Sequence, residues 1–95
     1  EKPLTIDIRK KSEFQSQHIT DAVNIPLNEI NNHLAEFPKD KPFILHCAGG
    51  YRSMIAASML KQRGWDNFSD VIGGFTEIAK TNVPKSEYIC PSTML

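Results

Sequence analysis

Residues 43–46, Phe-Ile-Leu-His, form a near-continuous apolar run that leads directly into Cys47, and the strongest helix signal of the chain, Ser53–Arg63, follows shortly afterwards. Such an apolar run is expected of a parallel strand that is buried on both faces. A strand that passes through a short loop into a helix is the repeating unit of an α/β sheet. The run therefore predicts a parallel sheet with Cys47 at the carboxyl end of a strand, where ligands gather in such folds.

The rest of the chain alternates between strand-like and helix-like segments, as a parallel sheet requires. Short apolar segments predict three further strands, over residues 4–8, 22–25 and 68–72. Helices are predicted from residue 12 and over residues 27–37, 53–63 and 75–80. Ser12 and Gln15 have capping-box spacing, and Gly64 is placed just after the end of a helix. We expect an α/β fold with helices on both faces of the sheet and an irregular tail over residues 82–95.

Composition argues against several classes of function. Lysine plus arginine and aspartate plus glutamate both number 11, and the resulting net charge of zero argues against nucleic-acid binding. No apolar stretch approaches the roughly 20 residues that span a bilayer, and no signal peptide opens the chain. The length of 95 residues allows one domain. His18, His33 and His46 are scattered, so we expect no metal and no cofactor.

The segment after Cys47 combines several features that stabilise an anion. Gly49 and Gly50 can adopt positive φ, so the loop can turn successive N–H groups inward. The helix that follows adds free N–H groups and a partial positive charge, and Arg52 adds a guanidinium. Each feature favours a thiolate over a thiol, so Cys47 is predicted to be a reactive nucleophile. The alternative is a buried cysteine that acts only as a small apolar side chain.

The chain resembles rhodanese-type sulfurtransferase domains over nearly its whole length. Four motifs in a fixed order carry the resemblance: Ile6-Asp7-Ile8-Arg9 with Glu13-Phe14; His18-Ile19 with Ala22-Val23-Asn24-Ile25-Pro26; Cys47–Ser53; and Gly73-Gly74-Phe75. The resemblance implies a three-layer α/β fold with about five parallel strands and helices on both faces.

The resemblance also implies roles for individual residues. Cys47 would be the catalytic nucleophile that takes up a sulfane sulfur as a persulfide. The backbone of six residues would bind that persulfide: Ala48, Gly49, Gly50, Tyr51, Arg52 and Ser53. Four motif residues away from the nucleophile are expected to give structural support: Asp7, Arg9, Glu13 and His18. Arg9 and Glu13 are placed to pair, Asp7 can accept from nearby backbone N–H groups, and His46 is expected to point to the opposite face from Cys47.

The implied activity is transfer of a sulfane sulfur from thiosulfate or a low-molecular-weight persulfide to a thiol or cyanide. Two alternatives stay open: a sulfur-carrier or docking module without turnover, and a phosphatase or arsenate reductase. The six-residue loop from Cys47 to Arg52 favours sulfur, because the related phosphatases and arsenate reductases use a loop one residue longer. Thiosulfate-preferring members often carry cations early in the loop, where this chain has Ala48, Gly49 and Gly50, so a persulfide donor is at least as well supported.

The loop sequence Cys-Ala-Gly-Gly-Tyr-Arg-Ser also resembles rhodanese domains that follow a metallo-β-lactamase-fold persulfide dioxygenase. The chain has no initiator methionine, so residues 1–95 are predicted to be one rhodanese-like domain excised from a longer protein with a fused N-terminal domain. The expected partners are a small-molecule sulfur donor and a thiol acceptor, with no nucleic acid and no membrane. A reactive cysteine favours the reducing cytoplasm. Whether Cys90 resolves a Cys47 persulfide into a disulfide stays open.

Overall fold

The structure is a computed structural model that describes residues 3–88. Its strands form one parallel sheet in the order β2-β1-β3-β4. The strands are β1 Leu4–Asp7, β2 Val23–Asn24, β3 Phe43–His46 and β4 Phe68–Asp70. Asp7 at the end of β1 lies in register with Asn24 on one side and His46 on the other. The predicted parallel α/β sheet is confirmed, with four strands in residues 3–88 where the resemblance implied about five.

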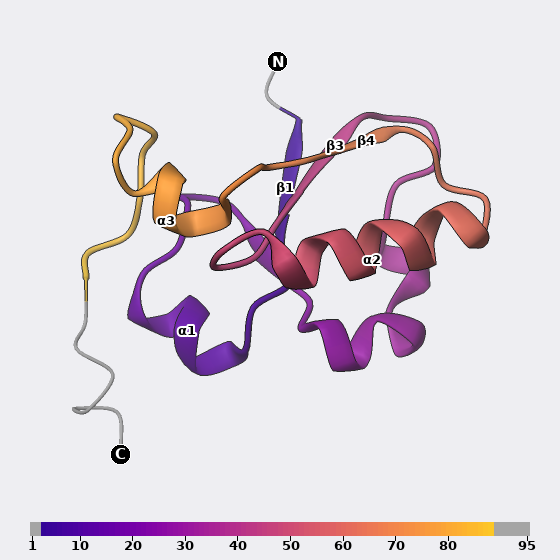
Figure 1. Ribbon diagram of the computed structural model, residues 1–95, viewed down its shortest axis with the longest axis horizontal. Coiled ribbons are helices and arrows are strands. Elements are labelled where there is room, and N and C mark those ends of the chain that lie inside the picture. The colour runs from indigo at the N-terminus through magenta and orange to yellow at the C-terminus, as the bar shows by residue number, and fades with distance from the viewer. Residues whose placement is uncertain (1–2, 89–95) are drawn as a thin grey trace.

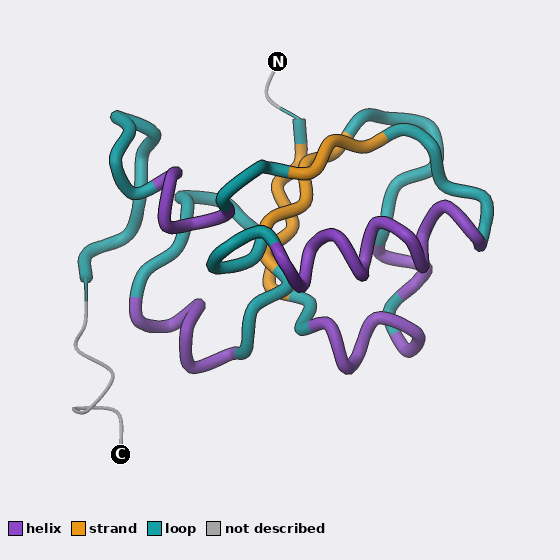
Figure 2. The backbone as a smooth tube through the Cα atoms, viewed as in Figure 1, coloured by secondary structure: helices purple, strands orange, loops and turns teal. Residues whose placement is uncertain are grey.

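Helices cover both faces of this sheet, so the predicted three-layer arrangement is confirmed. The helical elements are α1 Lys11–Ser16, the 3-10 helices η1 Leu27–Asn32 and η2 Leu34–Glu36, α2 Tyr51–Gln62, and α3 Gly74–Ile78. Figure 1 shows α1 and α3 on one side of the strands, with α2 on the other. Figure 2 shows the strands running between these two groups of helices. The loop between β3 and α2 therefore opens at the edge where the carboxyl ends of the strands meet.

Two predicted helices differ from the observed ones for local reasons. The first helix begins at Lys11, and Glu13 accepts a hydrogen bond from the Lys10 backbone N–H at 3.0 Å, so the predicted cap at Ser12 is wrong. The predicted helix over 27–37 is instead η1 and η2. The apolar pairs of that segment, 27 with 30 and 34 with 37, are three residues apart, which is the period of a 3-10 helix.

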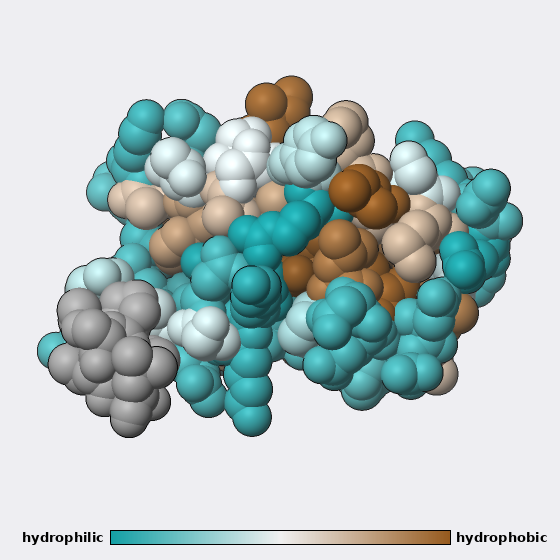
Figure 3. Space-filling model, turned by 60° about the horizontal axis from the view of Figure 1, so that its bottom comes forward, coloured by the Kyte–Doolittle hydropathy of each residue, from teal (hydrophilic) through white to brown (hydrophobic). Residues whose placement is uncertain are grey.

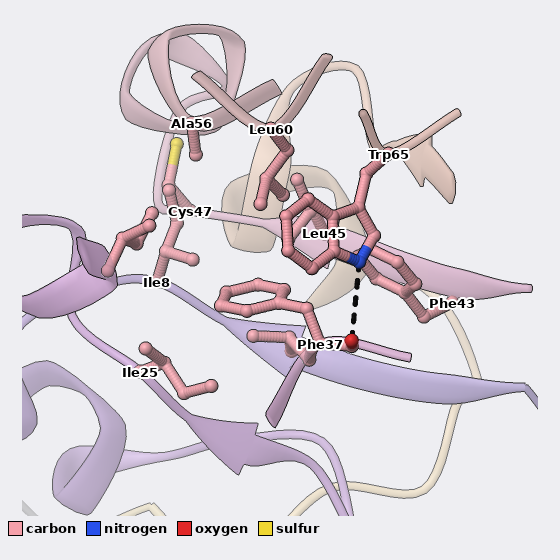
Figure 4. Close-up of a cluster of buried hydrophobic side chains, with 11 residues drawn as sticks. Ile8, Ile25, Phe37, Phe43, Leu45, Cys47, Ala56, Leu60 and Trp65 are labelled. Carbon is pink, nitrogen blue, oxygen red and sulfur yellow. Dashed lines mark hydrogen bonds between the residues drawn. The ribbon is translucent and has the colours of Figure 1, made fainter. Parts of the chain in front are cut away.

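A cluster of buried apolar side chains lies between the sheet and α2. Its members are Ile6, Ile8, Ile25, Ile30, Phe37, Phe43, Leu45, Cys47, Ala56, Leu60 and Trp65. In Figure 4 the sulfur of Cys47 points toward the helix that carries Ala56. The Trp65 indole N–H donates to the Phe37 carbonyl at 3.2 Å, which ties the cluster to the end of η2. Alternation along β3 places Cys47 in this cluster, whereas His46 contacts Phe75 of α3 on the other face, as expected.

Part of the predicted tail is tied to the domain. The Thr20 N–H donates to the Pro84 carbonyl at 2.9 Å, and the Ser86 N–H donates to the His18 carbonyl at 2.8 Å. Ile19 and Lys85 form an antiparallel bridge between these two bonds. Residues 89–95, and with them Cys90, lie outside the described residues. Within residues 3–88, no helix has the length and apolar character needed to cross a bilayer.

Candidate active site

The sulfur of Cys47 lies buried beneath the first turn of α2, with 1% of the residue exposed. The backbone N–H of Gly50 points at the sulfur from 3.1 Å, and the backbone N–H of Ser53 from 3.3 Å. The Ser53 hydroxyl oxygen lies 3.6 Å from the sulfur and 3.3 Å from the Gly50 carbonyl oxygen. Two backbone amides therefore donate to one sulfur atom, and the Ser53 hydroxyl lies beside that sulfur.

These contacts determine the ionisation of Cys47. Burial by itself raises the pKa of the thiol, because it penalises the charged form. The Ser53 hydroxyl and the backbone amides of Ser53, Gly50 and Arg52 outweigh burial, so the pKa of Cys47 lies below its ordinary value. The N-terminus of α2 adds the positive end of a twelve-residue helix. The site therefore favours a thiolate, which is the nucleophilic form of cysteine.

Of the two glycines in the loop, Gly50 is required by the backbone path. Gly50 is the N-cap of α2 with φ of 94°, in the left-handed region that favours glycine. A Cβ at Gly50 would lie 3.1 Å from the backbone nitrogen of Gly73. The helix therefore begins at Tyr51, two residues before the predicted start. A Cβ added at Gly49, by contrast, would have no neighbouring atom within 4 Å.

The turn before α3 holds the base of the loop. The Phe75 N–H donates to the Cys47 carbonyl at 2.6 Å, and both the N–H and the hydroxyl of Thr76 donate to the Ala48 carbonyl, at 2.9 and 3.0 Å. In a trans peptide the N–H points away from the carbonyl, so these bonds turn the amides of Ala48 and Gly49 away from α3. Gly74 allows the approach, because a Cβ there would lie 2.4 Å from the Cys47 carbonyl oxygen. The sequence marked Gly73-Gly74-Phe75 as a motif but gave it no role.

Arg52, the cation of the loop, is held by Glu13 of α1. The two terminal nitrogens of Arg52 donate to the two carboxylate oxygens of Glu13 at 2.7 and 3.0 Å. The hydrogen bond from Arg52 lowers the pKa of Glu13, and Glu13 in turn raises the pKa of Arg52. The prediction that Glu13 pairs with Arg9 is wrong, because the fold brings the loop to α1 and turns Arg9 inward.

Arg9 pairs instead with Asp7, and both residues are buried. The Arg9 Nε and Nη2 donate to the Asp7 carboxylate at 3.0 and 2.8 Å, and the Arg9 backbone N–H adds a third bond at 3.0 Å. The guanidinium also donates to the Gln17 carbonyl and lies 4.3 Å from the centre of the Phe75 ring. The predicted acceptance of a backbone N–H by Asp7 is confirmed. Through Phe75, this pair supports the turn that holds the loop.

The histidines do not contact the sulfur of Cys47. His46 is fully buried, and burial lowers its pKa, which favours the neutral imidazole. Its Nδ1 lies 3.2 Å from the Cys47 carbonyl oxygen. The ring of His18 stacks on that of Phe14 with ring centres 3.8 Å apart, and its Nδ1 lies 2.8 Å from the Phe14 carbonyl oxygen. The backbone N–H of His18 donates to the Ser86 hydroxyl oxygen, so His18 joins α1 to the segment around residue 86. Within residues 3–88, no group of three or more His, Cys, Asp or Glu side chains could hold a metal ion.

The rim of the loop carries exposed apolar side chains. Tyr51, Met54 and Ile55 are exposed on the first two turns of α2, and Ile72 is exposed just before Gly73. The face in Figure 3 shows apolar patches separated by a hydrophilic band. Of the six predicted loop residues, Tyr51 contributes backbone rather than side chain to the structure of the loop, because the residue is 73% exposed.

Comparison with known proteins identifies relatives of the whole arrangement. The model of the rhodanese-like domain family matches residues 1–81. The chain is 34% identical over 82 residues to the thiosulfate sulfurtransferase GlpE of Pseudomonas syringae, with 86% of this chain and 76% of that protein covered. It is 34% identical over 76 residues to the adenylyltransferase and sulfurtransferase uba4 of Ogataea parapolymorpha, with 79% of this chain covered. The chain spans only 20% of the length of that second relative.

The fold has close counterparts among solved structures. The crystal structure of a rhodanese-related protein from Thermoplasma volcanium superposes with a TM-score of 0.80 at 30% sequence identity. That comparison covers 87% of this chain and 82% of the other.

Proposed function

The chain belongs to the rhodanese-like domain family, and on that premise we propose that it is a sulfurtransferase that carries a sulfane sulfur on Cys47 as a persulfide. The observation that carries the proposal is the convergence of the Gly50 and Ser53 amides and the Ser53 hydroxyl on the Cys47 sulfur. These groups lower the pKa of Cys47, which favours the thiolate, so the proposed reaction needs no separate general base.

The reaction proceeds in two balanced displacements. In the first, the Cys47 thiolate attacks the outer sulfur of the donor, the S–S bond of the donor breaks, and its electron pair leaves with sulfite when the donor is thiosulfate. Cys47 then carries a persulfide anion. In the second, an acceptor thiolate or cyanide attacks the terminal sulfur, and the Cys47 thiolate leaves. No net oxidation occurs, and the protein returns to its starting form.

The loop is suited to both states of Cys47. A ring of N–H groups stabilises an anion through hydrogen bonds and supplies no acid strong enough to protonate it. The bonds from Phe75 and Thr76 fix the Cys47 and Ala48 carbonyls, so the donor amides are held in place before the sulfur arrives. Asp7, Arg9, Glu13 and His18 act as structural support in this proposal, because none of their hydrogen bonds reaches the sulfur.

The finer points of the function are proposals too. The donor is thiosulfate or a low-molecular-weight persulfide, and the acceptor is a thiol or cyanide. The reducing cytoplasm suits a thiolate that must stay unoxidised. The fused N-terminal metallo-β-lactamase-fold domain stays a prediction.

Intact-mass measurement tests the proposal directly. The protein is incubated with thiosulfate and, separately, with glutathione persulfide, and we expect a gain of one sulfur atom that a reducing thiol removes. The Cys47→Ser variant should gain none, and the Cys90→Ser variant should gain sulfur as the unaltered protein does. If neither donor gives the adduct on the protein, the proposal is refuted. An adduct without multiple turnover would favour the sulfur-carrier alternative.

A further inference from the structure

Arg52 is the single lysine or arginine in the segment from Cys47 to Ser53. An arginine fork binds an oxyanion best when both of its terminal nitrogens face that anion. Here both terminal nitrogens already donate to one carboxylate, that of Glu13, at 2.7 and 3.0 Å. Both terminal nitrogens of Arg52 are therefore occupied by a carboxylate of the protein itself, rather than being free to bind a substrate anion.

The pair is neutral as a unit and partly shielded from water. The Arg52 and Glu13 side chains are 30% and 33% exposed. The second guanidinium near the loop, that of Arg9, is neutralised in the same way by the buried Asp7 carboxylate. Both guanidiniums thus carry an anionic partner, and the positive charge that remains for a substrate is that of the backbone amides and the helix terminus.

We propose that Glu13 determines which sulfur donors the site accepts, by holding the Arg52 guanidinium away from them and by neutralising its positive charge. The site then favours donors with one negative charge at the reacting end over the dianion thiosulfate. This inference rests on the proposed sulfurtransferase function. Glu13 is a positioning residue in it, because its effect on the donor passes through Arg52.

Two donors that differ mainly in charge allow a direct test. Thiosulfate carries two negative charges, and methanethiosulfonate carries one, because a methyl group replaces an oxyanion. Both present the same outer sulfur to Cys47. The thiolate forms a bond to that sulfur, the donor S–S bond breaks, and the electron pair leaves with sulfite in one case and with methanesulfinate in the other.

The substitution Glu13→Gln removes the charge with little change in shape. The glutamine oxygen can still accept from the Lys10 N–H, as Glu13 does at 3.0 Å. Its NH₂ group replaces the second carboxylate oxygen and faces an N–H donor of Arg52, so one arm of the guanidinium is released. The matched control is Glu36→Gln, which removes an exposed carboxylate from η2, where the partner of that carboxylate is His33.

The measurement is the second-order rate constant of Cys47 persulfide formation, by rapid quench and intact mass, with each donor. We expect Glu13→Gln to raise the ratio of the thiosulfate to the methanethiosulfonate rate constant about five-fold, as one unit of charge several ångströms away predicts. In steady state the gain should appear in the KM for thiosulfate rather than in kcat. Glu36→Gln should leave the ratio unchanged.

A double variant shows whether Glu13 acts through Arg52. In Glu13→Gln combined with Arg52→Gln, no guanidinium is released, so the ratio should return toward that of the unaltered protein. Thermal melting of each variant shows that it is folded. If Glu13→Gln does not fold, Glu13→Asp takes its place, with a shorter carboxylate that loosens the pair and a smaller rise expected.

The outcomes separate this inference from the proposed function. Uptake of sulfur with a ratio that Glu13→Gln leaves unchanged, or lowers, overturns the role of Glu13 and leaves the sulfurtransferase intact. A rise that persists in the double variant overturns the route through Arg52. Absence of uptake from both donors by the unaltered protein overturns the function and the inference together.

Discussion

Replacement of Gly74 by alanine should weaken the fold through the base of the active-site loop. Gly74 has φ of 57°, and a Cβ there would lie 2.4 Å from the Cys47 carbonyl oxygen and 2.7 Å from the Ala48 carbonyl carbon and oxygen. Real Cβ atoms do not approach backbone so closely. The loop and the turn must therefore move apart, and the bonds from Phe75 and Thr76 to these carbonyls lengthen or break.

The loss in the free energy of unfolding caused by Gly74→Ala is the sum of two contributions. A left-handed φ costs an alanine roughly 1 kcal/mol or more, and each of two weakened backbone hydrogen bonds costs about 1 kcal/mol. The free energy of unfolding should fall by about 3 kcal/mol, which is a large share of the roughly 5–15 kcal/mol of a typical domain. In a domain of this size, the melting temperature should fall by roughly 12–24 °C.

Urea unfolding followed by circular dichroism measures the loss, and Gly49→Ala is the matched control. A Cβ at Gly49 meets nothing within 4 Å, so that variant should stay within about 0.5 kcal/mol of the unaltered protein. The rate of sulfur uptake by Gly74→Ala should also fall, because the loop amides lose their support. Equal stability of the two variants would refute the reasoning that the Gly74 turn holds the loop.

Three further predictions follow from the same contacts. Ser53→Ala removes the hydroxyl that helps to lower the pKa of Cys47, so the pH profile of persulfide formation should move to higher pH, and an unmoved profile would contradict this role. Arg9→Lys keeps the charge beside Asp7 but loses the fork, so urea unfolding should show a loss of about 2 kcal/mol or more; a loss below 0.5 kcal/mol would show that the fork is dispensable. Burial lowers the pKa of His46 from 6.5, so the unfolded chain binds a proton that the folded protein does not, and stability should fall as pH drops below about 6.5. His46→Gln should flatten that part of the stability profile, and an unchanged slope would mean that other groups cause it.

Much of the fold follows from local sequence pattern. The strand over residues 43–46 was predicted with its observed ends, because a near-continuous apolar run lies between Pro42 and Cys47. The predicted second strand over 22–25 is shorter in the structure, Val23–Asn24, because only Ile6 and Asp7 of β1 pair with it. The apolar residues of segment 27–37 are spaced three, four and three residues apart, which fits an α-helix. The two spacings of three also fit two short 3-10 helices, so the pattern alone does not distinguish the two kinds of helix.

Some features of the candidate site could likewise be predicted from the sequence, and others could not. The lowered pKa of Cys47 was predictable, because the strand end, the glycines and the helix start are neighbours in sequence. The partners of the two arginines were not. Arg9 and Glu13 are four residues apart and opposite in charge, yet Glu13 meets Arg52, which is 39 residues away. Sequence distance alone could not predict that the Glu13 carboxylate would bind Arg52, which the fold brings to it from a distant loop.

The lowered pKa of Cys47 follows from local sequence, because the groups that lower it belong to one continuous segment from Cys47 to Ser53. The contacts that hold this segment, and the charges around it, depend on how the chain folds. Gly74 and Phe75 reach the loop because α3 follows β4 back to the same edge of the sheet. Glu13 reaches Arg52 because α1 begins at that edge too. Such contacts join segments far apart in the chain, and they exist only once the sheet has brought the strand ends together.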